Sequence, residues 1–274
     1  MTQATKPRVT IFATGGTIAG DSESNTDTLY YDSANLGIDS LLAAVPEIHD
    51  VADVTGEQFL NVGSHEIRNV DLLSLAKKIQ YQFENDLADG VVITHGTDTL
   101  EETAFFLDIT TQFDKPVVVV GAMRPATAIS ADGPMNLLQA TALAASPEAR
   151  NRGTMIVLSD RIHPAFYTSK THANSLDTFR APEQGSLGYF LNAKPYFYFT
   201  PAQASNKPYF DVSQFKSLPR VDVIYSYQDA TADLLEVAIE RGAKGIVING
   251  AGSGWGSPAL ELAAAELTAK GFPI

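Results

Sequence analysis

The sequence predicts an α/β fold with a mostly parallel sheet, because short β-branched runs alternate along the chain with longer amphipathic segments. This alternation is typical of successive βα units. Four runs are expected to form strands: Arg8–Ala13, Gly90–His95, Pro116–Gly121 and Thr154–Leu158. Three segments between them are expected to form helices that flank the sheet: Asn69–Glu84, Asp98–Ile109 and Asp132–Ala145.

The alternation stops near Asn192, and the segment that follows is expected to be a linker. It is aromatic, contains several prolines and turn residues, and has no stable period as far as Pro219. Two further strands and two helices are then expected: Val221–Tyr225, Thr231–Arg241, Gly245–Asn249 and Ala259–Lys270. The sequence therefore predicts a larger N-terminal α/β domain over 1–191, a linker over 192–219 and a smaller α/β domain over 220–274.

The composition argues against several classes of protein. A formal net charge of −13 disfavours a nucleic-acid partner, because binding phosphates requires a basic surface. The absence of cysteine excludes disulfides, thiolate catalysis and cysteine-bound metals. No apolar run approaches the roughly 20 residues of a membrane helix, and residues 1–10 lack the apolar core of a signal peptide. We expect a protein without a membrane partner that is either cytoplasmic or the processed form of an exported protein.

Two loops rich in glycine and threonine follow predicted strands, at Thr14–Gly20 and Thr94–Thr99. Ligands of open α/β sheets bind beyond the carboxyl ends of the strands, so both loops are expected to line one crevice. Each has a threonine directly after a glycine, and peptide N–H groups in such turns can stabilise an oxyanion. The alternative is a tight turn or a phosphate-binding turn, but the first loop matches neither nucleotide-binding fingerprint.

Other catalytic templates have less support in the sequence. There is no G-x-S-x-G motif, and the five histidines lack a metal-binding spacing, so we expect them to be surface or loop residues. Glu101 and Glu102 are adjacent in a predicted helix and are expected to form a solvated face. The glycine-rich run Gly250–Gly256 is expected either to bind an anion or to contribute to a subunit contact.

Several stretches resemble the signature blocks of bacterial-type L-asparaginases, most closely those of the exported class. The blocks are residues 14–20, 44–48, 62–67, 93–108, 119–137, 168–179 and 218–228. The resemblance covers nearly the whole chain. It implies a flavodoxin-like sheet and an amidohydrolase that converts L-asparagine to L-aspartate and ammonia without a cofactor or metal. Some action on L-glutamine is a further expectation.

The same resemblance implies roles for individual residues. Thr17 matches the primary nucleophile, and Tyr31 matches a tyrosine of a flexible loop that helps to activate it. Thr97, Asp98 and Lys170 match a second polar triad. The residues implied to contact the substrate are Gly16, Ser64, His65, Gly96, Thr97, Asp98 and Ala122, with the backbone carbonyl of Ala122 receiving the amide group.

The sequence departs from the family pattern at three places. His65 stands where the family carries Gln or Glu, which bears on the preference between asparagine and glutamine. Trp255 replaces a small polar residue that reaches into a neighbouring subunit's site. The chain also ends, at Ile274, before the family's last elements, so we expect a shortened C-terminal domain and weak activity. Members of the family are homotetramers built as dimers of dimers, and we expect the same assembly here.

The alternative to an enzyme is a non-catalytic relative that binds aspartate or asparagine.

Overall fold

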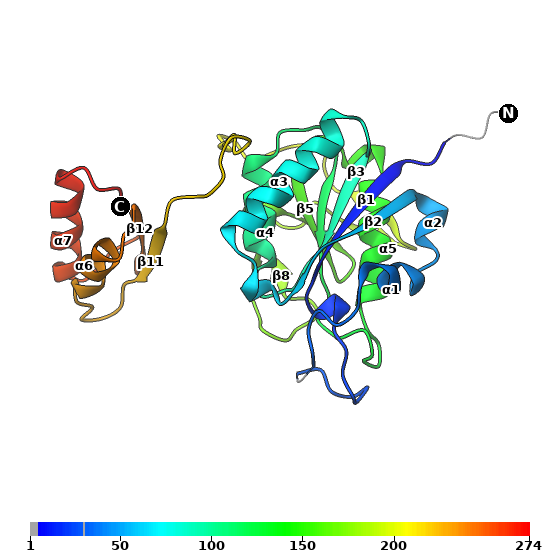
Figure 1. The fold of residues 1–274 in the computed structure, drawn as a ribbon, viewed down its shortest axis with the longest axis horizontal. Coiled ribbons are helices and arrows are strands. Elements are labelled where there is room, and N and C mark those ends of the chain that lie inside the picture. Colours follow the sequence, from blue (N-terminus) through cyan, green and yellow to red (C-terminus); the bar gives the residue numbers. More distant parts are fainter. Residues whose placement is uncertain (1–4, 30) are drawn as a thin grey trace. The chain divides into compact units, whose positions relative to one another are not determined.

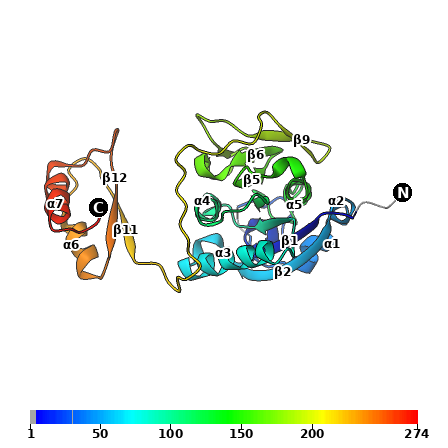
Figure 2. The same ribbon diagram turned by 90° about the horizontal axis from the view of Figure 1, so that it is seen from above.

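The computed structural model describes residues 5–29 and 31–274, which form two compact units on either side of the Phe215–Lys216 bond. In the N-terminal unit, the described residues form an eight-stranded sheet with helices on both faces (Figures 1 and 2). The predicted α/β fold is therefore confirmed. Within the described part of the chain, no helix has the length and apolar character needed to span a bilayer.

Five parallel strands form one side of this sheet, from the edge strand β2 inward, in the order β2-β1-β3-β4-β5. This is the flavodoxin-like order, whose switch point lies between β1 and β3. In the register of these two strands, Val9 is level with Gly90 and Ala13 with Thr94, so both end at the same edge. The bounds are β1 Arg8–Gly15, β2 Asp53–Val62, β3 Gly90–Thr94, β4 Val117–Val120 and β5 Thr154–Leu158.

Helices cover the two faces of the sheet in separate groups (Figure 2). One face carries α3 (Asn69–Glu84) and α4 (Leu100–Thr110), and the other carries α1 (Ile38–Ala43), α2 (Ile48–Val51) and α5 (Gly133–Ala144). On the second face, buried aliphatic residues of α1, α2 and α5 pack against the valines and isoleucines of the strands. The strands and helices predicted for this unit are confirmed, with ends that agree within two residues.

Part of the predicted linker belongs to an antiparallel extension of the sheet. Strands β6 (Arg161–Pro164), β9 (Gly188–Leu191) and β10 (Lys194–Phe197) continue the sheet beyond β5. The prediction that residues 194–197 belong to a linker is therefore wrong. The segment docks because Tyr196 stacks on Tyr189, with ring centroids 5.7 Å apart. Its proline is tolerated because β10 is an edge strand.

The C-terminal unit contains the four elements that the sequence predicts. Strands β11 (Val221–Tyr225) and β12 (Gly245–Asn249) are parallel, and α6 (Asp233–Glu240) and α7 (Pro258–Ala269) complete the unit. Its buried core is formed by Ile224, Leu235, Ala238, Ala243, Ile246 and Leu260.

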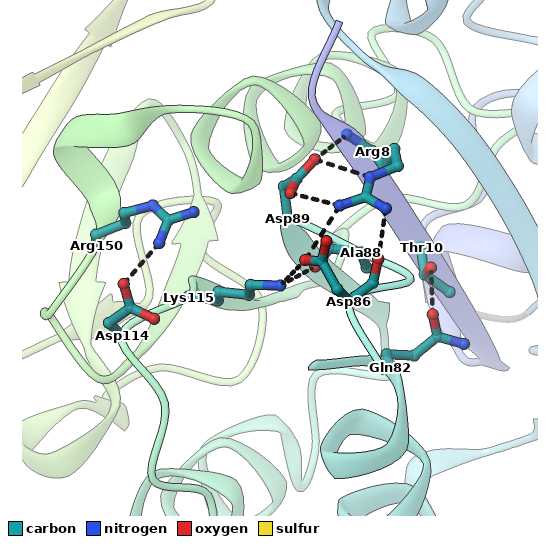
Figure 3. Close-up of polar contacts among 9 residues, drawn as sticks. All are labelled: Arg8, Thr10, Gln82, Asp86, Ala88, Asp89, Asp114, Lys115 and Arg150. Atoms are coloured by element: carbon teal, nitrogen blue, oxygen red, sulfur yellow. Dashed lines mark hydrogen bonds and ion pairs between the residues drawn. The ribbon is translucent and has the colours of Figure 1, made fainter. Parts of the chain in front are cut away.

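Charged side chains at the amino ends of the central strands pair with one another (Figure 3). At the start of β1, Arg8 donates from Nη2 to Oδ1 of Asp89 at 2.9 Å and from Nε to Oδ2 at 3.2 Å. Hydrogen bonds from Arg8 lower the pKa of Asp89 to about 2. Lys115 pairs with Asp86 at 2.8 Å. Because ligands of such sheets bind at the opposite edge, we interpret this cluster as stabilising.

We expect Asp89→Asn to lower the free energy of unfolding at pH 7 by about 1–2 kcal/mol. The pKa shift of Asp89 by itself corresponds to a somewhat larger free energy. The side chain is partly exposed, and screening by solvent reduces that free energy. A carboxylate whose pKa falls on folding stabilises the protein above its ordinary pKa near 4, and this stability is lost as the pH falls to about 2. Urea denaturation across this range measures the effect.

The matched control is Asp86→Asn, since that carboxylate pairs with the same cluster but its side chain is 74% exposed. We expect it to destabilise the protein less than the change at Asp89. A cost of Asp89→Asn that stays the same at pH 7 and at pH 2.5 would contradict the assignment.

Candidate active site

The first threonine loop follows β1 and folds into a short 3₁₀ turn, Thr17–Ala19. It requires glycine at two positions, since Gly15 and Gly16 have φ angles of 102° and 80°. The N–H of Gly16 donates to the carbonyl of Val62 at the end of β2, at 3.1 Å. The turn leaves the Thr17 side chain largely buried, with 6% exposed.

The second threonine loop follows β3, and its own His95 stabilises it through two hydrogen bonds of the imidazole ring. Because the carbonyl of Gly96 can only accept, His95 Nδ1 donates to it at 2.7 Å, and Nε2 accepts from the Thr103 hydroxyl at 2.8 Å. Burial lowers the pKa of His95 to about 4, so the ring is neutral near pH 7. The prediction that the histidines are surface or loop residues is wrong for His163, which is buried in strand β6 (Arg161–Pro164), whereas His95 does lie in a loop, although it is fully buried.

The two loops are in direct contact. The Thr14 hydroxyl donates to the Thr94 carbonyl at 2.8 Å, which ties the two strand ends together. A Cβ atom on Gly16 would lie 2.2 Å from the Cα of Gly96, and one on Gly96 would lie 2.9 Å from the Ser64 hydroxyl oxygen. The backbones therefore meet where a side chain would not fit, and the buried Ser64 lies beside this contact.

Each threonine has a polar neighbour within hydrogen-bond distance. The Thr17 hydroxyl and the Tyr31 hydroxyl are 2.7 Å apart. Lys170 Nζ donates to Thr97 Oγ1 at 3.1 Å and to Asp98 Oδ1 at 2.8 Å. The Lys170 side chain is 13% exposed, whereas that of Asp98 is 71% exposed and so is open to an incoming ligand.

A third loop, after β4, lies against the second. A Cβ atom on Gly121 would be 3.0 Å from the Thr97 methyl group, so the next residue, the fully buried Ala122, lies at the same edge of the sheet. The loop is fixed by Asp132, whose carboxylate accepts the N–H groups of Met123 at 3.0 Å and Arg124 at 2.9 Å.

His65 is the candidate residue least engaged with the others. It is exposed, and its ring lies over Gly63, where a Cβ atom would be 2.6 Å from the imidazole Cε1. The structure thus places five of the candidate residues in neighbouring loops: Gly16, Thr17, Ser64, Gly96 and Thr97. Tyr31 is within hydrogen-bond distance of Thr17, and Lys170 is hydrogen-bonded to Thr97 and Asp98.

Glu101 was not among the candidates, and the prediction that it lies on a solvated face is wrong. It is half-buried, and its Oε1 accepts the backbone N–H of Lys170 at 3.0 Å. The only signal in the sequence is its place three residues after Asp98, on the helix that the threonine loop enters. The exposed Glu102 does fit the prediction.

Chemically, the arrangement offers two hydroxyl nucleophiles, each beside a group able to exchange a proton, next to backbone N–H groups in tight turns. In the part of the chain that the structure describes, no group of three or more His, Cys, Asp or Glu residues is placed to hold a metal ion. The hydroxyl groups and the neighbouring backbone N–H groups suit acyl transfer.

Comparisons with known proteins cover both units. Residues 8–203 match the family model Asparaginase, N-terminal, and residues 220–274 match the Glutaminase/Asparaginase C-terminal domain. The chain is 48% identical to probable L-asparaginase 4 of Schizosaccharomyces pombe, over 98% of this chain and 76% of that protein. It is 47% identical to L-asparaginase 2 of Bacillus subtilis, over 98% of this chain and 72% of that protein. The crystal structure of a probable cytoplasmic L-asparaginase from Campylobacter jejuni superposes with a TM-score of 0.92, at 46% identity, over 97% of this chain and 82% of that one.

Proposed function

This chain belongs to the asparaginase family, and we propose that it hydrolyses the side-chain amide of L-asparagine to L-aspartate and ammonia with Thr17 as the nucleophile. The main support from the structure is the contact between the Thr17 and Thr97 loops at the β1/β3 switch point. Each hydroxyl there has a partner for proton exchange, at 2.7 Å and 3.1 Å.

In the proposed reaction, Thr17 Oγ attacks the amide carbon and its proton passes to the Tyr31 oxygen, while the Tyr31 hydroxyl releases its own proton toward the departing nitrogen. Backbone N–H groups of the loops stabilise the oxyanion of the tetrahedral intermediate, a contribution of roughly 3–4 kcal/mol per donor in other enzymes. The C–N bond then breaks, the nitrogen takes up a proton, and ammonia leaves. Water hydrolyses the resulting ester of Thr17 to aspartate, and the hydroxyl is restored.

We propose that Thr97, Asp98 and Lys170 act together on the other side of the substrate. Lys170 is within reach to exchange a proton with the Thr97 hydroxyl. Asp98 and Ser64 would hold the α-ammonium and α-carboxylate groups, which favours an α-amino acid over a simple amide. Gly16 and Gly96 allow the close approach of the backbone, and the Ala122 carbonyl would receive the amide NH₂ group.

His65, beside Ser64, would contact the amino-acid head group and set the preference between asparagine and glutamine. We also propose a homotetramer, because the face of β11 and β12 exposes apolar side chains that a subunit contact would cover. These side chains are Val221, Val223, Tyr225 and Val247. Light scattering coupled to size-exclusion chromatography tests the assembly.

The activity is tested by measuring ammonia release from L-asparagine, L-glutamine and a simple aliphatic amide, with Thr17→Val as the background. We expect asparagine to be hydrolysed fastest and the aliphatic amide slowest. The alternative, a non-catalytic protein that binds aspartate or asparagine, predicts binding of aspartate in calorimetry but no ammonia. That result would reject the proposed activity.

A further inference from the structure

Glu101 contacts the segment that carries Lys170, and nothing in the reaction above uses it. Its Oε1 accepts the backbone N–H of Lys170 at 3.0 Å. Its other oxygen, Oε2, is buried and has no hydrogen-bond partner among the described residues. An unpartnered buried carboxylate oxygen costs free energy, and such groups in folded proteins call for an explanation.

The backbone of Lys170 is not held by the main sheet. Lys170 belongs to β7 (Ser169–Lys170), which pairs with β8 (Phe179–Arg180) in a separate two-stranded sheet. Glu101 lies in the first turn of α4, directly after the loop that carries Thr97 and Asp98. Its hydrogen bond therefore links the backbone of Lys170 to the element that positions the two partners of the lysine ammonium group.

We propose that Glu101 is a positioning residue, which sets the backbone of Lys170 so that Nζ reaches Thr97 Oγ1 and Asp98 Oδ1 together. Its carboxylate acts as a hydrogen-bond acceptor and does not touch the substrate. Phe105 of the same helix packs on Phe166, with ring centroids 5.3 Å apart, so the segment stays docked when the bond is lost and the lysine shifts only slightly. This inference rests on the proposed role of Lys170.

The test compares Glu101→Met, which has a similar shape but no acceptor, with Glu101→Gln, which keeps one. We expect Glu101→Met to lower kcat for asparagine by about 10- to 100-fold, because a misplacement near 1 Å has an effect of this order. KM should change less than about 3-fold. Glu101→Gln should keep kcat within about 3-fold of the wild type, and Glu102→Met, a change at the exposed neighbour, should leave both constants unchanged.

A double-mutant cycle with Lys170→Met separates positioning from a general loss of structure. If Glu101 acts through Lys170, adding Glu101→Met to Lys170→Met lowers kcat no further. An equal fold-change in both backgrounds, or wild-type kcat in Glu101→Met, overturns the inference. If Lys170→Met alone keeps full activity, the proposed role of Lys170 fails instead. If Glu101→Met does not fold, the inference depends on Glu101→Gln, whose kcat must stay near that of the wild type.

Discussion

A Thr17→Val variant is expected to release ammonia from L-asparagine at least about 10³-fold more slowly than the wild type, because it lacks the attacking hydroxyl. Valine has nearly the same shape as threonine and suits a side chain that is 6% exposed, so the fold should persist. The Tyr31 hydroxyl, 2.7 Å from Thr17 Oγ1, would lose its partner but would remain beside solvent and substrate. Steady-state and single-turnover ammonia assays measure the loss.

Two matched variants show whether the loss comes from the nucleophile. Thr17→Ser keeps a hydroxyl and should retain most of the activity. Thr14→Val removes a buried hydroxyl at the same strand end, where it donates to the Thr94 carbonyl at 2.8 Å. That change should reduce stability by about 1–2 kcal/mol while leaving Thr17 in place. Wild-type ammonia release by Thr17→Val would show that another group attacks the amide.

The central strands could be predicted from sequence because both of their faces are buried. The residues of β3, β4 and β5 are all buried, so each strand is a nearly continuous apolar run. Strand β2 could not be found in this way. It is an edge strand with a half-exposed, polar sequence, and its position depends on pairing with β1.

Strand β10 was missed for a different physical reason. Its proline and aromatic residues are typical of a linker, and they form a strand only because partners from elsewhere cover them. The guanidinium of Arg152 lies 3.6 Å from the centre of the Phe197 ring, and Tyr189 stacks on Tyr196. Such contacts depend on the folded sheet and leave no local period in the sequence.

The residues of the candidate site also differ in how far the local sequence predicts them. The two threonine loops could be proposed from their position after strands, since that position is a local property of the sequence. Tyr31 and Lys170 came only from the family resemblance, because they lie 14 and 73 residues from the threonines they contact. Glu101 was missed because its burial depends on the segment that packs over the first turn of α4.

A Gly16→Ala variant is expected to lose most of its activity, by about 10²-fold or more, and about 2–4 kcal/mol of unfolding free energy. Its new Cβ atom would lie 2.2 Å from the Cα of Gly96, so the two loops must separate. The backbone at this position also has φ 80° and ψ −170°, a conformation that is essentially restricted to glycine. Ammonia assays and urea denaturation measure the two effects.

Gly185→Ala separates the clash from the backbone strain. Gly185 has a similar φ angle, 75°, but a Cβ atom there would meet nothing within 4 Å. Its replacement should therefore lower stability by about 1 kcal/mol and leave kcat unchanged. Because the two variants share the positive φ, a larger loss in Gly16→Ala reflects the contact between the loops together with the ψ of −170° at Gly16. Equal, small effects of both changes would mean that the Thr17 and Thr97 loops do not meet as closely as the proposed reaction requires.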